Sequence, residues 1–337
     1  MNMLTHSEYG ASLRVESGIE LPDLPSARIA VDVHTPDFRS LRSPPVVLVC
    51  LPGGGMNRRY YDLMPSDGDS SFSFARQMSA RGFIVVTMDH LGIGDSDRPE
   101  DGYLLTADLL ARANSQATHA VLRRLREGSL VPGIPRLPHL LSLGVGHSMG
   151  AMMTVLQQAQ AQQHAGIVLL GFSTRGLPEY VPAEARELAA DPAAARVHLP
   201  RLAKKMFVES YPVIRPDPQS NSIYGGGNAD PRAVEAIKAA RGPLLPVPAF
   251  MSMLPGNVAP EAAQIEVPIF LGLGERDMAG PTHQIPAAFP KSRDVTLHIL
   301  KEAGHSHFLF PSRDGLFERL ALWIRAVVEI SAERAAG

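Results

Sequence analysis

The sequence holds a single cysteine, Cys50, in 337 residues, so no disulfide can form within the chain. Cys50 lies inside an apolar run, where we expect a buried and unreactive thiol rather than a nucleophile. Aromatic residues are scarce at 6%, and charged residues amount to 20% with a formal net charge of −2. Because the two signs are interspersed, no basic surface for nucleic acid is indicated.

Long apolar runs are also missing. No run approaches the roughly 20 residues that a membrane-spanning helix needs. Residues 1–18 lack the cationic start and the apolar segment of a secretory signal. These two absences favour a cytoplasmic protein without a membrane span.

What the sequence does contain is a regular alternation of strand-like and helix-like segments, with 45% hydrophobic residues overall. Such alternation predicts an α/β fold, a mostly parallel sheet with helices on both faces. The strand-like runs lie at 29–33, 46–51, 83–88, 140–145, 167–170, 269–273 and 295–300. Helical spacing is found at 104–127, at 151–156 and in a C-terminal segment from 316 to 327.

The interval 175–262 breaks this alternation. It is rich in proline, and it holds short helix-like pieces at 183–190 and 231–240. A structureless loop of this length is improbable in a compact domain. Its apolar residues, among them Met206, Phe207 and Met253, argue against a disordered insert. We therefore predict a mainly helical cap at 175–262, inserted into a core formed by 1–174 and 263–337.

The most informative motif is Gly146-His147-Ser148-Met149-Gly150, which joins a strand-like run to a helix-like run. The pattern G-x-S-x-G in this context predicts a sharp turn that exposes a serine hydroxyl at the edge of the sheet. Glycine is needed on either side because a side chain there would collide with the neighbouring strand or helix. Ser148 is therefore the predicted nucleophile.

A serine nucleophile needs an imidazole to accept its proton and a carboxylate to orient that imidazole. His305 follows the last strand-like run and is the predicted base. His307 is the alternative, because in an extended segment both would point to the same side. Asp277 follows the preceding strand-like run and is the predicted carboxylate, with Glu275 as the alternative. The order Ser148, Asp277, His305 is that of hydrolases built on such a sheet.

Two backbone N–H groups should stabilise the negative charge that develops on the substrate oxygen. One is that of Met149, directly after the serine and at the start of a helix. The other should come from the glycine-rich segment 52–56, where Gly54 is the first choice and Gly55 the second. Consecutive glycines let the backbone approach an oxyanion closely.

These motifs resemble those of the α/β-hydrolase family over nearly the whole chain apart from the predicted cap. The matching segments are 52–55, 89–96, 146–150, 274–277 and 304–305, of which 89–96 resembles a D-x-x-G-x-G-x-S turn with a structural role. The sequence departs from the family at Pro52, where a histidine usually begins the oxyanion loop. Backbone amides do the work there, so we expect the loop to keep its role. The resemblance implies a serine hydrolase that needs no metal and no organic cofactor.

The resemblance does not choose among the activities of the family, which include esterases, lipases, lactonases, amidases, C–C bond hydrolases and acyltransferases. We predict hydrolysis of a carboxylic ester or lactone through an acyl-enzyme, with C–C bond hydrolysis or acyl transfer as alternatives. A binding protein without catalysis is disfavoured by the intact triad. A dinucleotide-binding oxidoreductase requires G-x-G-x-x-G, and the two candidate segments carry Met149 and Asp97 at the last position.

Methionine is frequent near the serine and in the predicted cap, which suggests an adaptable apolar pocket. Met56, Met152, Phe250 and Met251 are the candidate lining residues, although ordinary core packing is an alternative for each. We expect a small-molecule substrate with an apolar portion.

Overall fold

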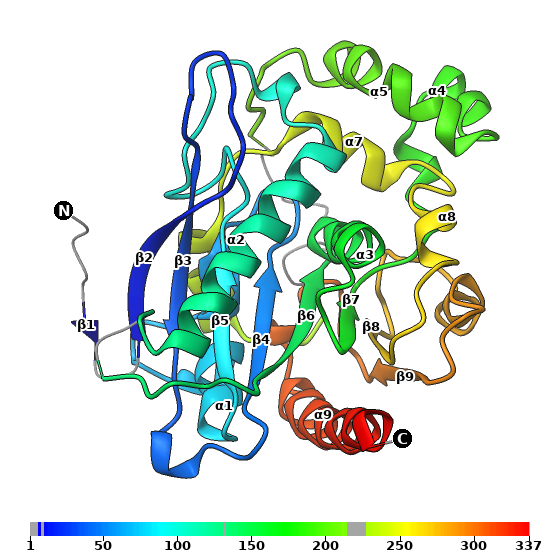
Figure 1. Cartoon of the computed structure of the whole chain (residues 1–337). Helices are drawn as coiled ribbons and strands as arrows, with labels where there is room; N and C mark the ends of the chain where they lie inside the picture. The colour runs from blue at the N-terminus through cyan, green and yellow to red at the C-terminus, as the bar shows by residue number, and fades with distance from the viewer. Residues whose placement is uncertain (1–5, 8–9, 131–132, 214–226, 337) are drawn as a thin grey trace.

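The computed structural model of the chain describes residues 6–7, 10–130, 133–213 and 227–336 (Figure 1). In this part of the chain nine strands form one sheet in the order β1-β2-β3-β5-β4-β6-β7-β8-β9. Strands β1, β2 and β3 are antiparallel to their neighbours, whereas β5, β4 and β6 to β9 run parallel. The bounds are β1 His6–Ser7, β2 Gly10–Glu16, β3 Arg28–His34, β4 Val46–Leu51, β5 Ile84–Met88, β6 Leu141–His147, β7 Gly166–Leu170, β8 Ile269–Gly274 and β9 Val295–Leu300.

Helices cover both faces of this sheet. The side chains of β4 alternate between two separate apolar clusters: its odd-numbered residues pack with α2 (Ala107–Glu127) and α3 (Met149–Ala161). Its even-numbered residues pack with α1 (Phe74–Ala80) and α9 (Arg313–Ala336). Because neighbouring side chains of a strand point to opposite faces, a run that is apolar throughout is buried on both sides. The predicted α/β fold is confirmed.

The helix predicted from 104 begins at Ala107 instead. The Thr106 hydroxyl accepts a hydrogen bond from the N–H of Leu109 and caps the helix, while Leu104 belongs to a preceding 3-10 turn, Gly102–Leu104. Threonine satisfies one of the backbone donors left free at a helix start. The helix ends at Gly128, whose φ of 69° is the left-handed conformation that glycine adopts without strain.

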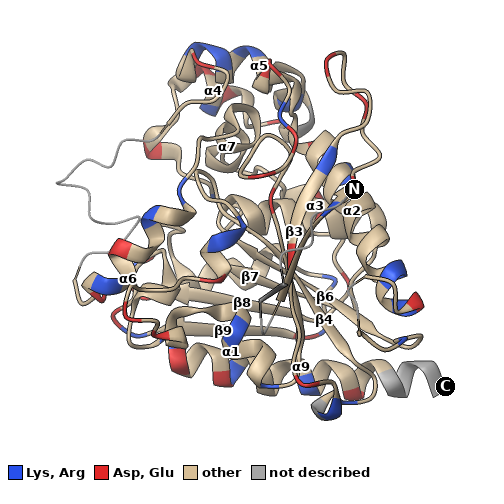
Figure 2. Cartoon of the chain, turned by 90° about the vertical axis from the view of Figure 1, so that its left-hand side faces the viewer, with Lys and Arg blue, Asp and Glu red and all other residues tan. Residues whose placement is uncertain are grey.

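The interval predicted to form a cap contains several helices, most of them short. These are α4 Ala183–Leu188, α5 Pro192–Phe207, α6 Pro231–Ala236, α7 Pro246–Met253 and α8 Ala259–Ala262, while residues 214–226 lie outside the described part of the chain. Helices α4, α5 and α7 lie beyond the carboxyl end of the parallel strands (Figure 1). Helix α6 lies apart from them (Figure 2) and packs against the 3-10 turn His307–Leu309.

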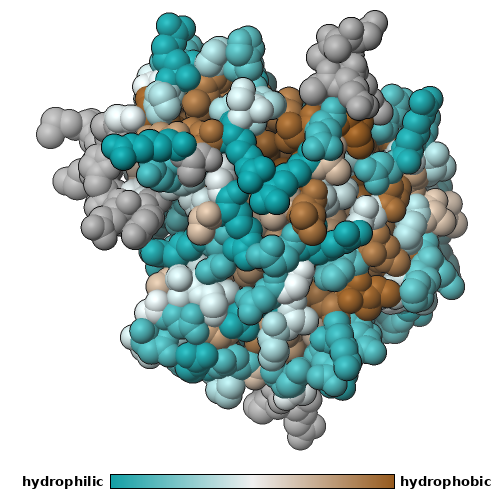
Figure 3. All heavy atoms as spheres, turned by 90° about the horizontal axis from the view of Figure 1, so that it is seen from below, coloured by the Kyte–Doolittle hydropathy of each residue, from teal (hydrophilic) through white to brown (hydrophobic). Residues whose placement is uncertain are grey.

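Charged and apolar groups are mixed on the surface. Figure 2 shows Lys and Arg interspersed with Asp and Glu along the helices on that side of the molecule. The face in Figure 3 is mostly hydrophilic, with apolar atoms showing between the polar side chains. Within the described residues no helix is long and apolar enough to cross the membrane.

A histidine is buried where α3 returns to β7. His164 is 3% exposed, and its Nδ1 lies 2.8 Å from the hydroxyl of Ser142. Its backbone N–H donates to the side chain of Gln158, which in turn donates to its carbonyl oxygen. Burial lowers the pKa of His164 to about 4.

This buried imidazole should make the fold sensitive to acid. An unfolded histidine binds its proton near pH 6.5, so between that pH and about 4 the unfolded state holds the extra proton and stability falls as the pH falls. Acidification from pH 7 to 4 should lower the unfolding free energy of the wild type. The corresponding loss in a His164→Asn variant should be smaller by roughly 3 kcal/mol. Urea unfolding across this range measures the difference. The exposed His119, changed to Asn, is the control, and equal pH dependence in all three proteins would contradict the prediction.

Candidate functional site

Ser148 lies at the turn between β6 and α3 with φ 55° and ψ −121°, a backbone conformation that is rare for a residue with a side chain. Its backbone N–H donates to the carbonyl oxygen of Leu170 in the neighbouring strand at 2.8 Å. The side chain is half-buried and lines a cavity at the carboxyl edge of the sheet. The hydroxyl of the predicted nucleophile is thus presented to a cavity by a strained turn.

The two glycines of this turn leave no room for a side chain. A Cβ at Gly146 would lie 2.4 Å from the Cα of Ala151, and one at Gly150 would lie 2.1 Å from the carbonyl oxygen of Leu51. Helix α3 therefore packs its first turn directly on the backbone of β4 and β6, which holds Ser148 in place.

Asp277 and His305 lie in contact. Asp277 follows β8 and His305 follows β9, and the Nδ1 of His305 is 2.8 Å from Oδ1 of Asp277. The backbone N–H of Ala279 donates to the same oxygen at 3.1 Å. Burial alone raises the pKa of Asp277, but the contacts with His305 and His307 outweigh it and hold that pKa well below its ordinary value. Because Asp277 is ionised, Nδ1 of His305 carries the proton, which leaves its Nε2 free to accept one.

Of the two histidines considered as the base, only His305 lines the cavity with Ser148. Both side chains contact Asp277, but His307 begins the 3-10 turn His307–Leu309 and is fully buried. Its Nε2 lies 3.0 Å from the other carboxylate oxygen of Asp277, Oδ2. The alternative carboxylate, Glu275, is exposed and accepts the backbone N–H of Glu302.

His147, inside the G-x-S-x-G motif, was not identified as functional from the sequence. Its Nε2 donates to the carbonyl oxygen of His305 at 2.8 Å, and its ring stacks on Tyr60 with the centroids 4.5 Å apart. Burial lowers the pKa of His147 well below its ordinary value, and the nearby His305 and His307 lower it further. The neutral ring of His147 thus ties the serine turn to the segment that carries His305.

The glycine-rich loop approaches the serine as expected. Gly53, Gly54 and Met149 line the cavity, whereas Gly55 does not. A Cβ at Gly53 would lie 3.2 Å from the Cβ of Ser148. Gly54 and Met149 stay the predicted oxyanion donors.

A histidine does help to hold this loop, although Pro52 occupies the usual position. Nε2 of the buried His90 donates to the carbonyl oxygen of Pro52 at 3.1 Å, and Nδ1 of His90 accepts from the amide of Asn114 at 3.1 Å. Burial lowers the pKa of His90, so the ring is neutral, as this pair of bonds requires. His90 belongs to the segment 89–96 that resembles a structural turn, and in that segment Asp89 pairs with the buried Arg58.

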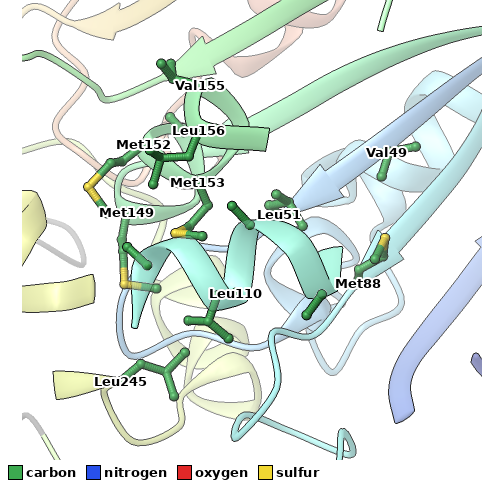
Figure 4. Packing of buried hydrophobic residues seen from close by; sticks show 14 of the residues in the cluster. Val49, Leu51, Met88, Leu110, Met149, Met152, Met153, Val155, Leu156 and Leu245 are labelled. Carbon is green, nitrogen blue, oxygen red and sulfur yellow. The ribbon is translucent and has the colours of Figure 1, made fainter. Parts of the chain in front are cut away.

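The cavity has a volume of about 560 Å³ and is mainly apolar. Among the described residues that line it there is no Asp, Glu, Lys or Arg. Two predicted lining residues, Met56 and Met152, do line it, and Figure 4 shows Met149 and Met152 along one side of α3. Lining residues that the sequence did not single out include Phe172, Leu177, Tyr180, Leu244 and Met278.

Phe250 and Met251 do not line the cavity, so this expectation is corrected. Helix α7 presents Ala249, Ser252 and Met253 to the cavity, which is the spacing of one helix face. Phe250 and Met251 are each 1% exposed and belong to the apolar core. Helical phase, rather than residue type, therefore decides which of these side chains a substrate could touch.

No group of three or more His, Cys, Asp or Glu placed to hold a metal ion occurs within the described residues.

Comparison with known proteins agrees with this fold. A model of the α/β-hydrolase family matches residues 48–317, and the chain belongs to that family. A search of curated proteins finds no match. Similar solved structures include a peroxisomal α/β-hydrolase from Saccharomyces cerevisiae (14% identity, 96% of this chain and 90% of that chain covered, TM-score 0.60). They also include a monoacylglycerol lipase from Paleococcus ferrophilus (16% identity, 89% of this chain and 99% of that chain covered, TM-score 0.58). An esterase from a Rhodococcus species is similar as well (16% identity, 93% of this chain and 99% of that chain covered, TM-score 0.55).

The packing of the turn gives a test of this geometry. Gly146→Ala and Gly150→Ala should each lower the unfolding free energy by about 3 kcal/mol or more, because the added methyl meets backbone atoms that cannot move aside. Gly315→Ala in helix α9 is the control: a Cβ there meets nothing within 4 Å, so the change should be neutral or stabilise by up to about 1 kcal/mol. Urea denaturation measures all three, and equal stability of Gly150→Ala and Gly315→Ala would rule out the packing described.

Proposed function

We propose that this protein is a serine-dependent hydrolase that cleaves a carboxylic ester or lactone through an acyl-enzyme. One observation carries the proposal. Ser148 and His305 line the same cavity, while Asp277 binds the opposite nitrogen of His305 and leaves its Nε2 free as a base. This is the division of roles that a serine nucleophile requires.

In the first half of the reaction, the hydroxyl oxygen of Ser148 attacks the carbonyl carbon of the ester, and Nε2 of His305 takes the hydroxyl proton. Asp277 stabilises the imidazolium that forms. The N–H groups of Gly54 and Met149 are proposed to donate to the oxyanion, and the Met149 N–H lies at the start of helix α3, where negative charge is favoured. His305 then gives its proton to the departing alcohol oxygen.

In the second half, water attacks the acyl-enzyme. His305 removes a proton from the water, the second tetrahedral intermediate collapses, and the proton returns to the oxygen of Ser148. The acid is released and the enzyme is restored. A thiol, amine or second alcohol in place of water would give acyl transfer, so exclusion of water from the cavity decides between the two outcomes.

The cavity also supports a choice of substrate. Its walls are mainly apolar, the described lining residues include no Asp, Glu, Lys or Arg, and its volume is within the range of small-molecule sites. A neutral ester with an apolar acyl or alcohol group fits these walls. An esterase and a monoacylglycerol lipase among the similar structures are in keeping with this choice.

Replacing the nucleophile tests the proposal. Ser148→Ala should lower kcat for p-nitrophenyl butyrate by roughly 10⁴-fold, and His305→Ala should have a similar effect, because the three residues act as a unit. Ser252→Ala is the matched control: this serine lines the same cavity but donates to the carbonyl oxygen of Ala249, so its loss should change kcat less than about threefold. A Ser148→Ala enzyme with more than a tenth of the wild-type rate would refute the assignment. Absence of activity in the wild type over a panel of esters, lactones and amides would favour a binding protein instead.

The walls of the cavity lead to a prediction about chain length. Burial of one methylene contributes about 0.8 kcal/mol, so each CH₂ added to the acyl group should raise kcat/KM roughly fourfold until the cavity is full. Met253→Ala should reduce this increment, because added methylenes lose part of the wall. Met251→Ala on the other face of α7 should leave the increment unchanged. Rates for acetyl to octanoyl esters measure it, and three parallel profiles would show that Met253 does not contact the acyl group.

A further inference from the structure

The carboxylate of Asp277 is held by a histidine on each of its two oxygens. Oδ1 lies 2.8 Å from Nδ1 of His305, and Oδ2 lies 3.0 Å from Nε2 of His307. The side chains of Asp277 and His307 are both 0% exposed. His307 does not line the cavity, so no substrate would touch it.

The proton on His307 can be assigned from its surroundings. Nε2 lies 3.0 Å from Oδ2 of Asp277, and the backbone N–H of Gly274 points at Nε2 from 3.1 Å. Nδ1 is buried and has no hydrogen-bond partner among the described residues. A proton on Nδ1 would leave a buried donor unpaired and would set the lone pair of Nε2 against a carboxylate oxygen, and both are costly. We therefore place the proton on Nε2, from which it is donated to Oδ2 of Asp277. The N–H of Gly274, which lies between Nε2 and Oδ2, then donates to Oδ2 at 3.3 Å.

We propose that His307 is a positioning residue: by holding Oδ2 of Asp277, it fixes the plane of the carboxylate and so the orientation of the His305 imidazole. The inference rests on the proposed function, in which His305 is the base. Without His307, Oδ2 would keep only the 3.3 Å contact with the backbone N–H of Gly274, so the carboxylate could rotate more freely about its Cβ–Cγ bond and the His305 ring could turn away from Ser148. Fixing both oxygens removes this freedom before substrate binds.

The fold supports this role from both ends of a short segment. His305 and His307 are separated by one residue, and the carbonyl oxygen of His305 accepts the Nε2 proton of His147. The segment 305–307 is thus held by three contacts. One joins it to His147 at the serine turn, and two join it to Asp277 in the loop after β8. Asp277 gains two imidazole donors, and ionised Asp277 is the state that stabilises an imidazolium on His305.

The test compares two amides that differ by one methylene. The side-chain nitrogen of Gln reaches about as far as Nε2 of histidine, whereas that of Asn stops near the position of Nδ1. His307→Gln should keep kcat within about fivefold of wild type, because it still donates to Oδ2. His307→Asn should lower kcat roughly 10- to 100-fold with little change in KM, because orientation is lost and substrate contacts are not. The acid limb of kcat/KM against pH should move to lower pH in His307→Asn only, because a carboxylate that is free to rotate stabilises the His305 imidazolium less well.

A second readout does not need a substrate. The proton shared by His305 and Asp277 should give a low-field proton resonance in the wild type and in His307→Gln, broadened or lost in His307→Asn. If His307→Asn does not fold in a urea titration, His307→Leu, which also lacks a donor, replaces it. Equal kcat and an unmoved acid limb in His307→Gln and His307→Asn would overturn the inference, and so would equal loss in both. Retained activity in Ser148→Ala would instead overturn the proposed function, so the two failures are distinct.

Discussion

The positive φ of Ser148, 55°, is the constraint on which the site depends. Such a conformation costs of the order of 1–3 kcal/mol in a residue with a side chain, and it persists only where the surroundings fix it. Here the surroundings are the backbone contacts at Gly146 and Gly150 and the hydrogen bond from Ser148 to Leu170. The central strands that flank this turn are apolar throughout and packed on both faces. The stability of the core therefore maintains the strain of the turn.

Parallel strands explain how distant residues come together. β6, β7, β8 and β9 are consecutive neighbours in the sheet, and their carboxyl ends meet at one edge. Ser148, Asp277 and His305 each follow one of these strands. His147, directly before Ser148, contacts His305 although 158 residues separate them in the sequence. The loop after β4 completes the same edge from the other side of β6, and His90 supports it from beneath.

The sequence predicted the strands that are apolar on both faces, because a continuous run such as 46–51 has few other interpretations. It missed β2, an amphipathic strand on the antiparallel side whose alternation is short. The motifs placed Ser148, Asp277 and His305, and the structure brings Asp277 and His305 into contact; their roles remain proposals. What could not be predicted depends on local turns of the chain. A 3-10 turn separates His307 from His305, and the phase of α7 places Met253 rather than Met251 on the cavity. Neither the 3-10 turn nor the phase of α7 could be predicted from residue type or spacing.

The lone thiol has a practical consequence for spectroscopy. Cys50 lies in the central strand with no exposed surface, and burial raises its pKa well above the ordinary value, so it stays in the unreactive protonated form. We therefore expect the folded natural chain not to react with maleimide labels. A cysteine introduced at Val197 on α5, which is 78% exposed, would be the sole labelling position. A fluorophore or spin label there would report on the helices over the cavity without removal of any native residue from the core.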